Sequence, residues 1–385
     1  MKRKLRMGMV GGGIGAFIGA VHRMAAQLDG ECELVCGAFS STPERSRKSG
    51  ELLYLPPERV YGSYEEMFEK EKQLPIGERM DFVAIVTPNF MHFPPAKMAL
   101  ENGFHVMCDK PMTLNLAEAK ELESLVEKTG LMFGLTHNYT GYPMVKEARD
   151  MLINGAIGTV RKIVVEYPQG WLATKLEDTD NKQASWRADP SRTGAANCMG
   201  DIGTHAENLS EYITGLKITE LCSDLTSFVE GRTLDDDGNI LIRLDNGARG
   251  VLFASQIAVG EENGLRIRVW GEKGGLEWKQ EDPNNLIVKW LDKPMQMLRP
   301  GNEYLGERAA MNTRLPAGHP EGFIEAFANL YRNYIMVLRA VLNGEKPKPE
   351  YLDFPNVHDG VRGMAFIETA VESSSNGSVW TAFKS

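Results

Sequence analysis

Asp201 and His205 are the two residues whose types and spacing most directly suggest proton transfer. They stand four positions apart, so both side chains lie on one face if the segment is helical. A histidine titrates near neutral pH, and a neighbouring carboxylate can orient its ring. The pattern fits an acid–base pair or a purely structural Asp–His pair. A zinc site is less favoured, because no third ligand stands at a suitable spacing.

Lys110 is a second candidate for chemistry. It lies in Cys-Asp-Lys-Pro, directly after the apolar segment 104–108, and Thr87-Pro88-Asn89 follows the apolar segment 82–86 in the same way. Open α/β sheets bind ligands at the carboxyl ends of their strands, so both segments are candidates for a binding edge. A lysine there can polarise a hydroxyl group, although an isolated surface lysine would look the same.

A glycine cluster at residues 11–15 follows the apolar segment 5–10 and precedes a predicted helix ending near Leu28. Missing side chains let the backbone approach a pyrophosphate, and a helix N-terminus supplies N–H donors and partial positive charge. The third glycine of the usual pattern is displaced to Gly19, which predicts a longer loop. The residues that we assign to the nucleotide here are Gly11, Gly13, Gly15, Phe17 and Ile18.

The end of the second predicted strand, near residue 39, bears on the type of nucleotide. A carboxylate there would bind a ribose 2′-hydroxyl and repel a 2′-phosphate. Ser40, Ser41 and Arg45 stand there instead. Hydroxyl groups and a guanidinium can hold a phosphate, which favours NADP slightly over NAD.

The elements that must position these residues fall into two patterns. Up to about residue 135, continuous apolar runs alternate with amphipathic stretches, which predicts a parallel sheet covered on both faces. After residue 150 the runs alternate, and Asp245-Asn246-Gly247 between two of them predicts a hairpin. We therefore expect an α/β domain with a parallel sheet over 1–137, an α+β domain with a mostly antiparallel sheet over 138–350, and a C-terminal helix in 351–385 that packs back on the first domain.

Composition excludes several function classes. The chain has 385 residues, 25% of them charged, and a net charge of −9, so it has no global basic field for nucleic acid or anionic lipid. Its five cysteines are scattered, which fits reduced thiols. The apolar run 7–21 imitates a signal peptide, but it is short and rich in glycine, so we expect a cytoplasmic protein. Asp235-Asp236-Asp237 resembles part of a calcium loop, and we expect a solvated hairpin tip instead.

Taken together, the motifs resemble those of one family. Gly19-Ala20-Val21-His22, Thr87-Pro88-Asn89 with His92, Asp109-Lys110-Pro111 and the segment 200–205 occur in the order seen in the Gfo/Idh/MocA (glucose–fructose oxidoreductase/inositol dehydrogenase) family. The resemblance implies a Rossmann domain over 1–137 and a large, mostly antiparallel open sheet in the second domain, through which a dimer or tetramer would form. It also implies NAD(P)-dependent oxidation or reduction of a sugar, glycoside or cyclitol. By motif match it implies catalytic roles for Lys110, Asp201 and His205. It also implies cofactor contacts for Thr87, Pro88, Asn89, His92, Asp109 and Lys110.

Two departures accompany the resemblance. The usual glutamate before the lysine is Asp109 here, one methylene shorter, and the glycine loop is longer than usual.

Substrate-binding residues are expected in the second domain. A tryptophan can cover a pyranose face, while arginine or glutamine side chains bind hydroxyl groups. Trp171 could instead be a core residue, and Arg187 could pair with Asp189. The candidates are Asn138, Tyr139, Gln169, Trp171, Trp186, Arg187 and His319.

The expected reaction is hydride transfer between a nicotinamide and a ring carbon, with His205 taking the hydroxyl proton, Lys110 stabilising the alkoxide and Asp201 orienting the imidazole. Three alternatives stay open. A redox-assisted glycoside-cleaving enzyme would consume no net NAD(P). A nucleotide-sensing regulator would be expected to lack the lysine or the histidine, and both are present. A secreted sugar enzyme is the third. No metal is expected.

Overall fold

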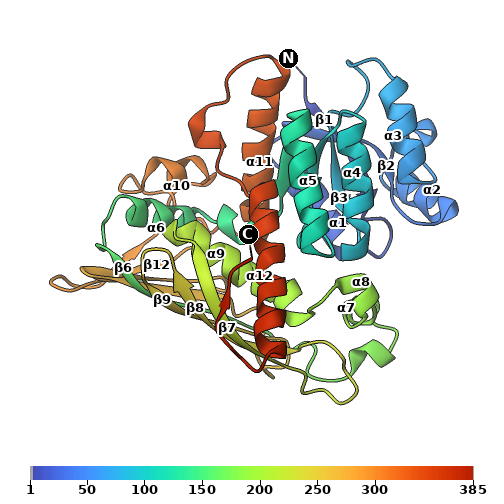
Figure 1. The fold of residues 1–385 in the computed structure, drawn as a ribbon. Helices are drawn as coiled ribbons and strands as arrows, with labels where there is room; N and C mark the ends of the chain where they lie inside the picture. The colour runs from blue at the N-terminus through green and yellow to red at the C-terminus, as the bar shows by residue number, and fades with distance from the viewer. Residues whose placement is uncertain (1–2, 385) are drawn as a thin grey trace. The chain divides into compact units, whose positions relative to one another are not determined.

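The chain forms two compact units in the computed structural model, which describes residues 3–384. Unit 1 combines Met1–His137 with Phe327–Val361, and unit 2 combines Asn138–Ala326 with Arg362–Ser385. Both units are discontinuous in sequence, and two of the three divisions fall inside long helices, α11 (Phe323–Leu342) and α12 (Val357–Ser375). Figure 1 traces these elements along the chain.

Unit 1 contains a five-stranded sheet in the order β2-β1-β3-β4-β5. All four strand pairings are parallel, and β3 and β4 are buried along their whole length. The strands are β1 (Leu5–Gly11), β2 (Cys32–Ala38), β3 (Phe82–Val86), β4 (His105–Cys108) and β5 (Phe133–Leu135). The predicted parallel sheet, with continuous apolar strands, is therefore confirmed.

Five helices follow these strands along the chain. They are α1 (Phe17–Gln27), α2 (Pro43–Leu52), α3 (Tyr64–Gln73), α4 (Phe93–Glu101) and α5 (Leu116–Thr129). Figure 1 shows α4 and α5 side by side. Local chemistry sets their ends: the side chain of Asn115 accepts a hydrogen bond from the Glu118 N–H at the start of α5, and Gly130 ends that helix with a φ of +66°.

Unit 2 is built on a nine-stranded sheet in the order β13-β12-β11-β10-β6-β9-β8-β7-β14. Every pairing is antiparallel except that of β6 with β9. The strands are β6 (Val160–Pro168), β7 (Ile218–Thr226), β8 (Asp237–Leu244), β9 (Arg249–Ser255), β10 (Arg266–Gly271), β11 (Gly274–Lys279), β12 (Leu286–Trp290), β13 (Gln296–Leu298) and β14 (Thr381–Ala382). The predicted hairpin joins β8 to β9, and Gly247 in its turn has a φ of +89°.

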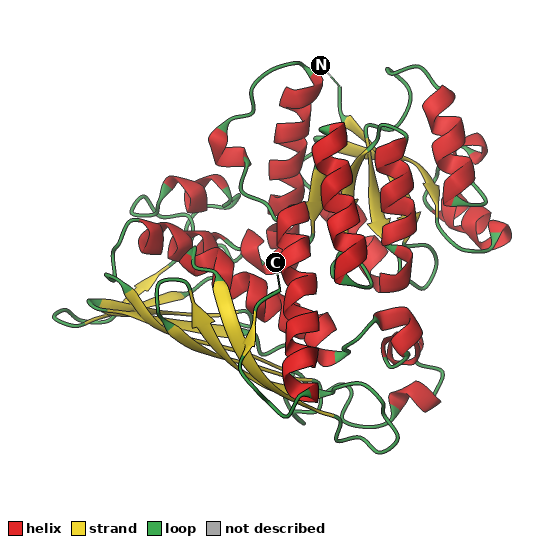
Figure 2. Ribbon diagram, in the orientation of Figure 1, coloured by secondary structure: helices red, strands yellow, loops and turns green. Residues whose placement is uncertain are grey.

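Helices α6 (Pro143–Ile153) and α9 (Thr204–Thr214) pack against each other and against this sheet. Figure 2 shows both on the same face of the strands. A single π-helical segment, Met199–Gly203, leads directly into α9. Such wide turns occur frequently at functional sites. Three short helices complete the unit: α7 (Lys182–Arg187), α8 (Pro190–Thr193) and α10 (Glu307–Met311).

The acidic run before β8 is buried, so the expectation of a solvated hairpin tip is wrong. Asp236 is 0% exposed and forms an ion pair with Arg232 at 3.0 Å. It also accepts hydrogen bonds from the backbone N–H groups of Phe228 and Val229. A buried carboxylate is tolerated when charge and N–H donors replace its hydration, as they do here.

The apolar N-terminal run forms β1 and the start of α1. Within residues 3–384, no helix is long and apolar enough to cross a membrane. The same residues contain no group of three or more His, Cys, Asp or Glu placed to hold a metal ion. The five cysteines are all free thiols.

Candidate active site

In unit 1, side chains at Gly11 in the glycine loop and at Gly19 in α1 would clash with neighbouring atoms. A Cβ at Gly11 would lie 2.8 Å from Thr87 Cγ2, and a Cβ at Gly19 would lie 2.3 Å from the Gly12 Cα. Gly12 itself has a φ of +70°, a conformation that favours glycine. The displaced third glycine therefore lets α1 approach the loop closely, as the third glycine of a dinucleotide-binding loop does.

The outer turn of the same loop is open. A Cβ at Gly15 would meet nothing within 4 Å, and Phe17, which begins α1, is 71% exposed. The N–H groups of Gly13 and Ile14 are bonded to Phe39 O and Ser49 Oγ, but no side chain caps the first turn of α1 among the described residues. The exposed start of α1, with its N–H donors and partial positive charge, fits a pyrophosphate.

The three residues predicted for the ribose end follow β2, and one of them, Arg45, contacts the glycine loop. The Arg45 guanidinium donates to Ile14 O at 3.2 Å, and the Ser40 hydroxyl accepts from the Thr42 N–H at 3.3 Å. Ser41 and Arg45 are exposed. The arrangement leaves hydroxyl groups and a guanidinium, with no carboxylate from residue 39 to 43, beside the glycine loop.

His92 ties together the two loops that follow β3 and β4. It is 1% exposed, and its ring nitrogens lie 2.7 Å from Thr87 O and 2.7 Å from Pro111 O. The loop containing Pro88 and Asn89 and the loop containing Lys110 are therefore held together at the carboxyl end of the sheet. This is the edge at which open α/β sheets bind their ligands.

The Asp109 carboxylate is hydrogen-bonded to neighbouring residues of unit 1. Its Oδ1 accepts hydrogen bonds from the Thr136 hydroxyl at 2.7 Å and from the Lys110 N–H at 2.9 Å, and His22 Nε2 lies 3.9 Å away. Burial alone would raise the pKa of Asp109, but His22, Lys110 and His92 outweigh it and hold this pKa well below its usual range. Asp109 is therefore ionised, and its carboxylate fixes the backbone from which Lys110 projects.

In unit 2, Asp201 lies on the π-helical segment, and two donors share one of its oxygens. Arg187 Nε donates to Asp201 Oδ2 at 3.2 Å, and Gln256 Nε2 donates to the same oxygen at 2.9 Å. Arg187 therefore pairs with Asp201, while the Asp189 side chain caps α8 by accepting from the Ser191 N–H. The Asp201 carboxylate is therefore held by a guanidinium and by an amide donor.

His205, at the start of α9, lies beside two phenol rings. The ring of Tyr139 meets it edge-on with centroids 4.7 Å apart, and the centroid of the Tyr167 ring lies 6.3 Å away. The two phenol hydroxyls are hydrogen-bonded to each other, and Asn263 bonds to both, at 2.7 Å from Tyr167 and 3.2 Å from Tyr139. Burial raises the pKa of Tyr139, so this phenol is neutral at neutral pH.

Four other predicted substrate residues join this network. Gln169 donates to Asn263 Oδ1 at 2.8 Å and accepts from Trp171 Nε1 at 3.1 Å. The Arg187 guanidinium lies over the Trp186 ring at 4.3 Å and the Trp171 ring at 5.9 Å. These aromatic and amide groups are of the types that bind polyhydroxylated rings.

Two predicted substrate residues lie outside this network. His319 is exposed, and its ring bonds locally to Pro316 O at 3.1 Å. Asn138 is buried, with no hydrogen-bond partner for its Nδ2 among the described residues. Conversely, Gln256 and Asn263 were not predicted, because a single amide after a strand carries no recognisable sequence pattern.

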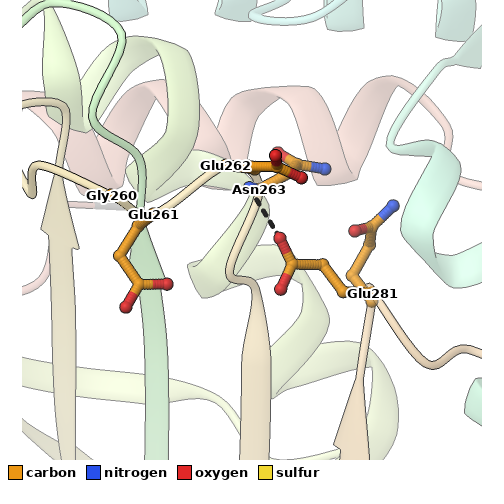
Figure 3. Close-up of a pocket in the computed structure, with 6 residues that line it drawn as sticks. Gly260, Glu261, Glu262, Asn263 and Glu281 are labelled. Atoms are coloured by element: carbon orange, nitrogen blue, oxygen red, sulfur yellow. Dashed lines mark hydrogen bonds between the residues drawn. The ribbon is translucent and has the colours of Figure 1, made fainter.

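A cavity of about 570 Å³ adjoins the network. Figure 3 shows Glu261 and Glu281 projecting from its two neighbouring chain segments, with Asn263 between them. The Asn263 N–H donates to Glu281 Oε1 at 2.9 Å, while its side chain bonds to the two tyrosines. Asn263 therefore connects the cavity wall to the phenols beside His205. The lining residues are Gly260, Glu261, Glu262, Asn263, Gln280 and Glu281.

Two family models match this chain, one in each unit. The oxidoreductase family with an NAD-binding Rossmann fold matches residues 5–137, and the GFO/IDH/MocA C-terminal domain matches residues 145–277. The uncharacterized oxidoreductase YfiI of Bacillus subtilis is 36% identical over 100% of this chain and 98% of its own length.

Two solved structures are similar over nearly their whole length. An oxidoreductase from Sinorhizobium meliloti is 45% identical, with a TM-score of 0.89 over 98% of this chain and 99% of its own. An inositol dehydrogenase homologue from Azotobacter vinelandii, in complex with NADH and myo-inositol, is 34% identical, with a TM-score of 0.92 over 100% of this chain and 98% of its own. The chain therefore belongs to the Gfo/Idh/MocA family of NAD-binding oxidoreductases.

Proposed function

We propose that the protein is an NAD(P)-dependent dehydrogenase that oxidises a ring hydroxyl of an uncharged polyhydroxylated molecule, a sugar, glycoside or cyclitol, or reduces the corresponding ketone. The observation that carries the proposal is the network around His205. It combines a hydrogen-bonded carboxylate, neutral phenols, amides and tryptophans, and groups of these types bind rings that carry hydroxyl groups. The myo-inositol complex of the Azotobacter homologue supports the same substrate class.

The residues of unit 1 that fit the dinucleotide are the glycine loop and the start of α1, because an added side chain would fill the approach at Gly11 and Gly19. When bound, the nicotinamide supplies or accepts the hydride. Lys110, at the carboxyl end of β4, provides positive charge. This charge stabilises the hydroxyl oxygen of the substrate as that hydroxyl loses its proton. Asp109 keeps that lysine's backbone in place through Thr136 and the Lys110 N–H.

In unit 2 we assign the proton transfer to His205. An imidazole accepts the hydroxyl proton at neutral pH, and the Tyr139 ring restricts the plane in which it can lie. Asp201, one turn earlier along the chain, is proposed to orient the imidazole. Gln169, Trp171, Trp186 and Arg187 are proposed to bind the hydroxyl groups and one face of the ring.

For the cofactor, we propose that the 2′-phosphate of NADP is accepted as well as the 2′-hydroxyl of NAD, with a slight preference for NADP. Ser40, Ser41 and Arg45 stand beside the glycine loop where a carboxylate would exclude that phosphate.

The test is a panel of sugars, glycosides and cyclitols assayed with NAD and with NADP, following reduced nicotinamide by absorbance and the ketone by mass spectrometry. We expect equal amounts of the two products. Cleavage of a glycoside without accumulation of reduced nicotinamide would instead identify the redox-assisted glycoside-cleaving alternative. Nucleotide binding without turnover of any panel member would contradict both reactions and favour the sensing regulator.

A further inference from the structure

We propose that Gln256 and Asn197 are positioning residues, a two-amide relay that orients the carboxylate of Asp201. The effect of the relay on catalysis rests on the proposed function, whereas its hydrogen bonds do not. Gln256 follows directly after β9, and Asn197 precedes the π-helical segment. Both side chains are 0% exposed.

The relay is a continuous chain of side-chain hydrogen bonds. Asn197 Nδ2 donates to Gln256 Oε1 at 3.1 Å, and Gln256 Nε2 donates to Asp201 Oδ2 at 2.9 Å. An ionised carboxylate only accepts hydrogen bonds, so Gln256 must turn its NH₂ group toward Asp201 and its oxygen toward Asn197. The direction of both amides is thus set by the charge on Asp201.

This orientation of the two amides leaves one buried oxygen atom without a hydrogen bond in the described part of the chain. Asn197 Oδ1 is buried and has no hydrogen-bond partner among the described residues. A buried unpaired oxygen destabilises a fold, so its retention needs a compensating interaction. Turning the two amides the other way would bring Gln256 Oε1 against the Asp201 carboxylate, and that repulsion explains why the observed direction is kept.

Backbone hydrogen bonds fix both amides to their elements. The two carboxylate oxygens of Asp235 accept from the N–H groups of Asn197 and Met199, at 2.7 and 2.8 Å. The Gln256 N–H donates to Asp236 O at 2.8 Å. The relay therefore joins the end of β9 and the segment before β8 to the helix that carries Asp201 and His205.

Other titratable groups also surround Asp201 and bear on any pH dependence. The Arg187 guanidinium from α7 is hydrogen-bonded to it. Burial raises the pKa values of Tyr139, Tyr167 and the Cys198 thiol, and electrostatic interaction with Asp201 adds to this rise. His205 lies one turn further along the helix, and the carboxylates of Asp235, Asp236 and Asp237 lie near Cys198. A test of the relay must therefore change Gln256 while leaving all of these groups intact.

The experiment is the isosteric variant Gln256→Glu. The introduced carboxylate can still accept from Asn197, but its second oxygen would meet the Asp201 carboxylate in place of an NH₂ donor. Two facing carboxylates share a proton, so the last proton leaves the pair at a raised pKa. We expect the acidic limb of the kcat/KM profile to move upward by at least about one pH unit.

The activity-independent measurement is the unfolding temperature of the parent and of Gln256→Glu between about pH 5 and pH 8. Because the folded state raises the pKa of the pair, the variant should lose stability relative to the parent as pH increases. The matched control is Asn246→Asp, the same amide-to-acid change at the opposite end of β9. Asn246 bonds to Val160 O and to the Ala248 N–H, far along the strand from the relay. Its difference from the parent should not grow with pH.

The variant Asp201→Asn tests whether the Asp201 carboxylate causes the pH-dependent destabilisation of Gln256→Glu. In that background the new amide at position 201 can donate to the carboxylate introduced at position 256, so the pH-dependent destabilisation caused by Gln256→Glu should largely disappear. A pH-independent loss of stability, or one that persists unchanged with Asp201→Asn, would overturn the relay. An absence of dehydrogenase activity in the parent would contradict the proposed function alone, because the unfolding measurements still decide on the relay.

Discussion

The contact between Gly12 and Gly19 gives a prediction whose sign is set by the structure. Gly19 lies in α1, where alanine is ordinarily preferred over glycine by about 1 kcal/mol. At this position, however, the new Cβ would lie 2.3 Å from the Gly12 Cα and 2.7 Å from the Gly12 oxygen. Both atoms are backbone, so neither can turn aside as a flexible side chain would.

The magnitude follows from these two opposing effects. Overpacking a tight contact costs about 1 to 3 kcal/mol, and a backbone contact this short belongs at the upper end of that range. Subtracting the gain in helix propensity, we expect Gly19→Ala to lower the free energy of unfolding by about 2 kcal/mol. The helix must also move away from the glycine loop, so we expect the affinity for NAD(H) to fall by about tenfold or more.

The assay combines chemical denaturation with titration of NADH, followed by its fluorescence. The matched control is Gly363→Ala in α12, where the added Cβ would be 4.0 Å from the nearest atom outside the helix backbone, Thr204 Cγ2. That variant should keep the parent's affinity and gain up to about 1 kcal/mol. A Gly19→Ala protein that is stabilised like the control and binds NADH normally would refute the account of the loop.

Two further predictions concern the buried charges before β8. Arg232→Met leaves the carboxylate of Asp236 buried without its cation, so we expect a loss of about 3 to 5 kcal/mol by chemical denaturation, whereas Lys70→Met, at an exposed ion pair with Glu66, should cost less than about 1 kcal/mol. Similar losses for the two variants would contradict the ion-pair explanation. Burial raises the pKa of Asp235 from 3.8 to about 6, so its proton is held more tightly in the folded chain. The resulting stability is present below about pH 4 and is lost as pH rises to about 6, by about 3 kcal/mol in total, and Asp235→Asn should abolish this dependence in denaturation curves.

The sequence was informative where a local pattern corresponds to a local structure. Continuous apolar runs predicted the parallel strands, and Asp245-Asn246-Gly247 predicted the β8–β9 hairpin. Asn115 and Gly130 bound α5 because capping depends on neighbouring residues alone. The glycine cluster predicted the loop at residues 11–15, but the longer loop expected up to Gly19 is wrong, because α1 already begins at Phe17 and Gly19 lies inside it.

The sequence was uninformative where partners come from distant segments. Asp235 to Asp237 look like a solvated turn until Arg232 and the N–H groups of Asn197 and Met199 are folded onto them. Gln256 contacts Asp201 from 55 positions away, and no periodicity records such a contact. Arg187 had a plausible partner two residues away, yet the fold pairs it with Asp201.

The most direct test of the central claim, that the protein is a dehydrogenase depending on Lys110, is the rate of reduced-nicotinamide formation by the parent and by Lys110→Ala with the best substrate of the panel. Lys97→Ala, which removes an exposed lysine paired with Glu121, is the control. We predict that Lys110→Ala lowers kcat by at least about a hundredfold, with the dissociation constant for the nucleotide changed by less than about threefold. Unchanged turnover in Lys110→Ala would contradict the account.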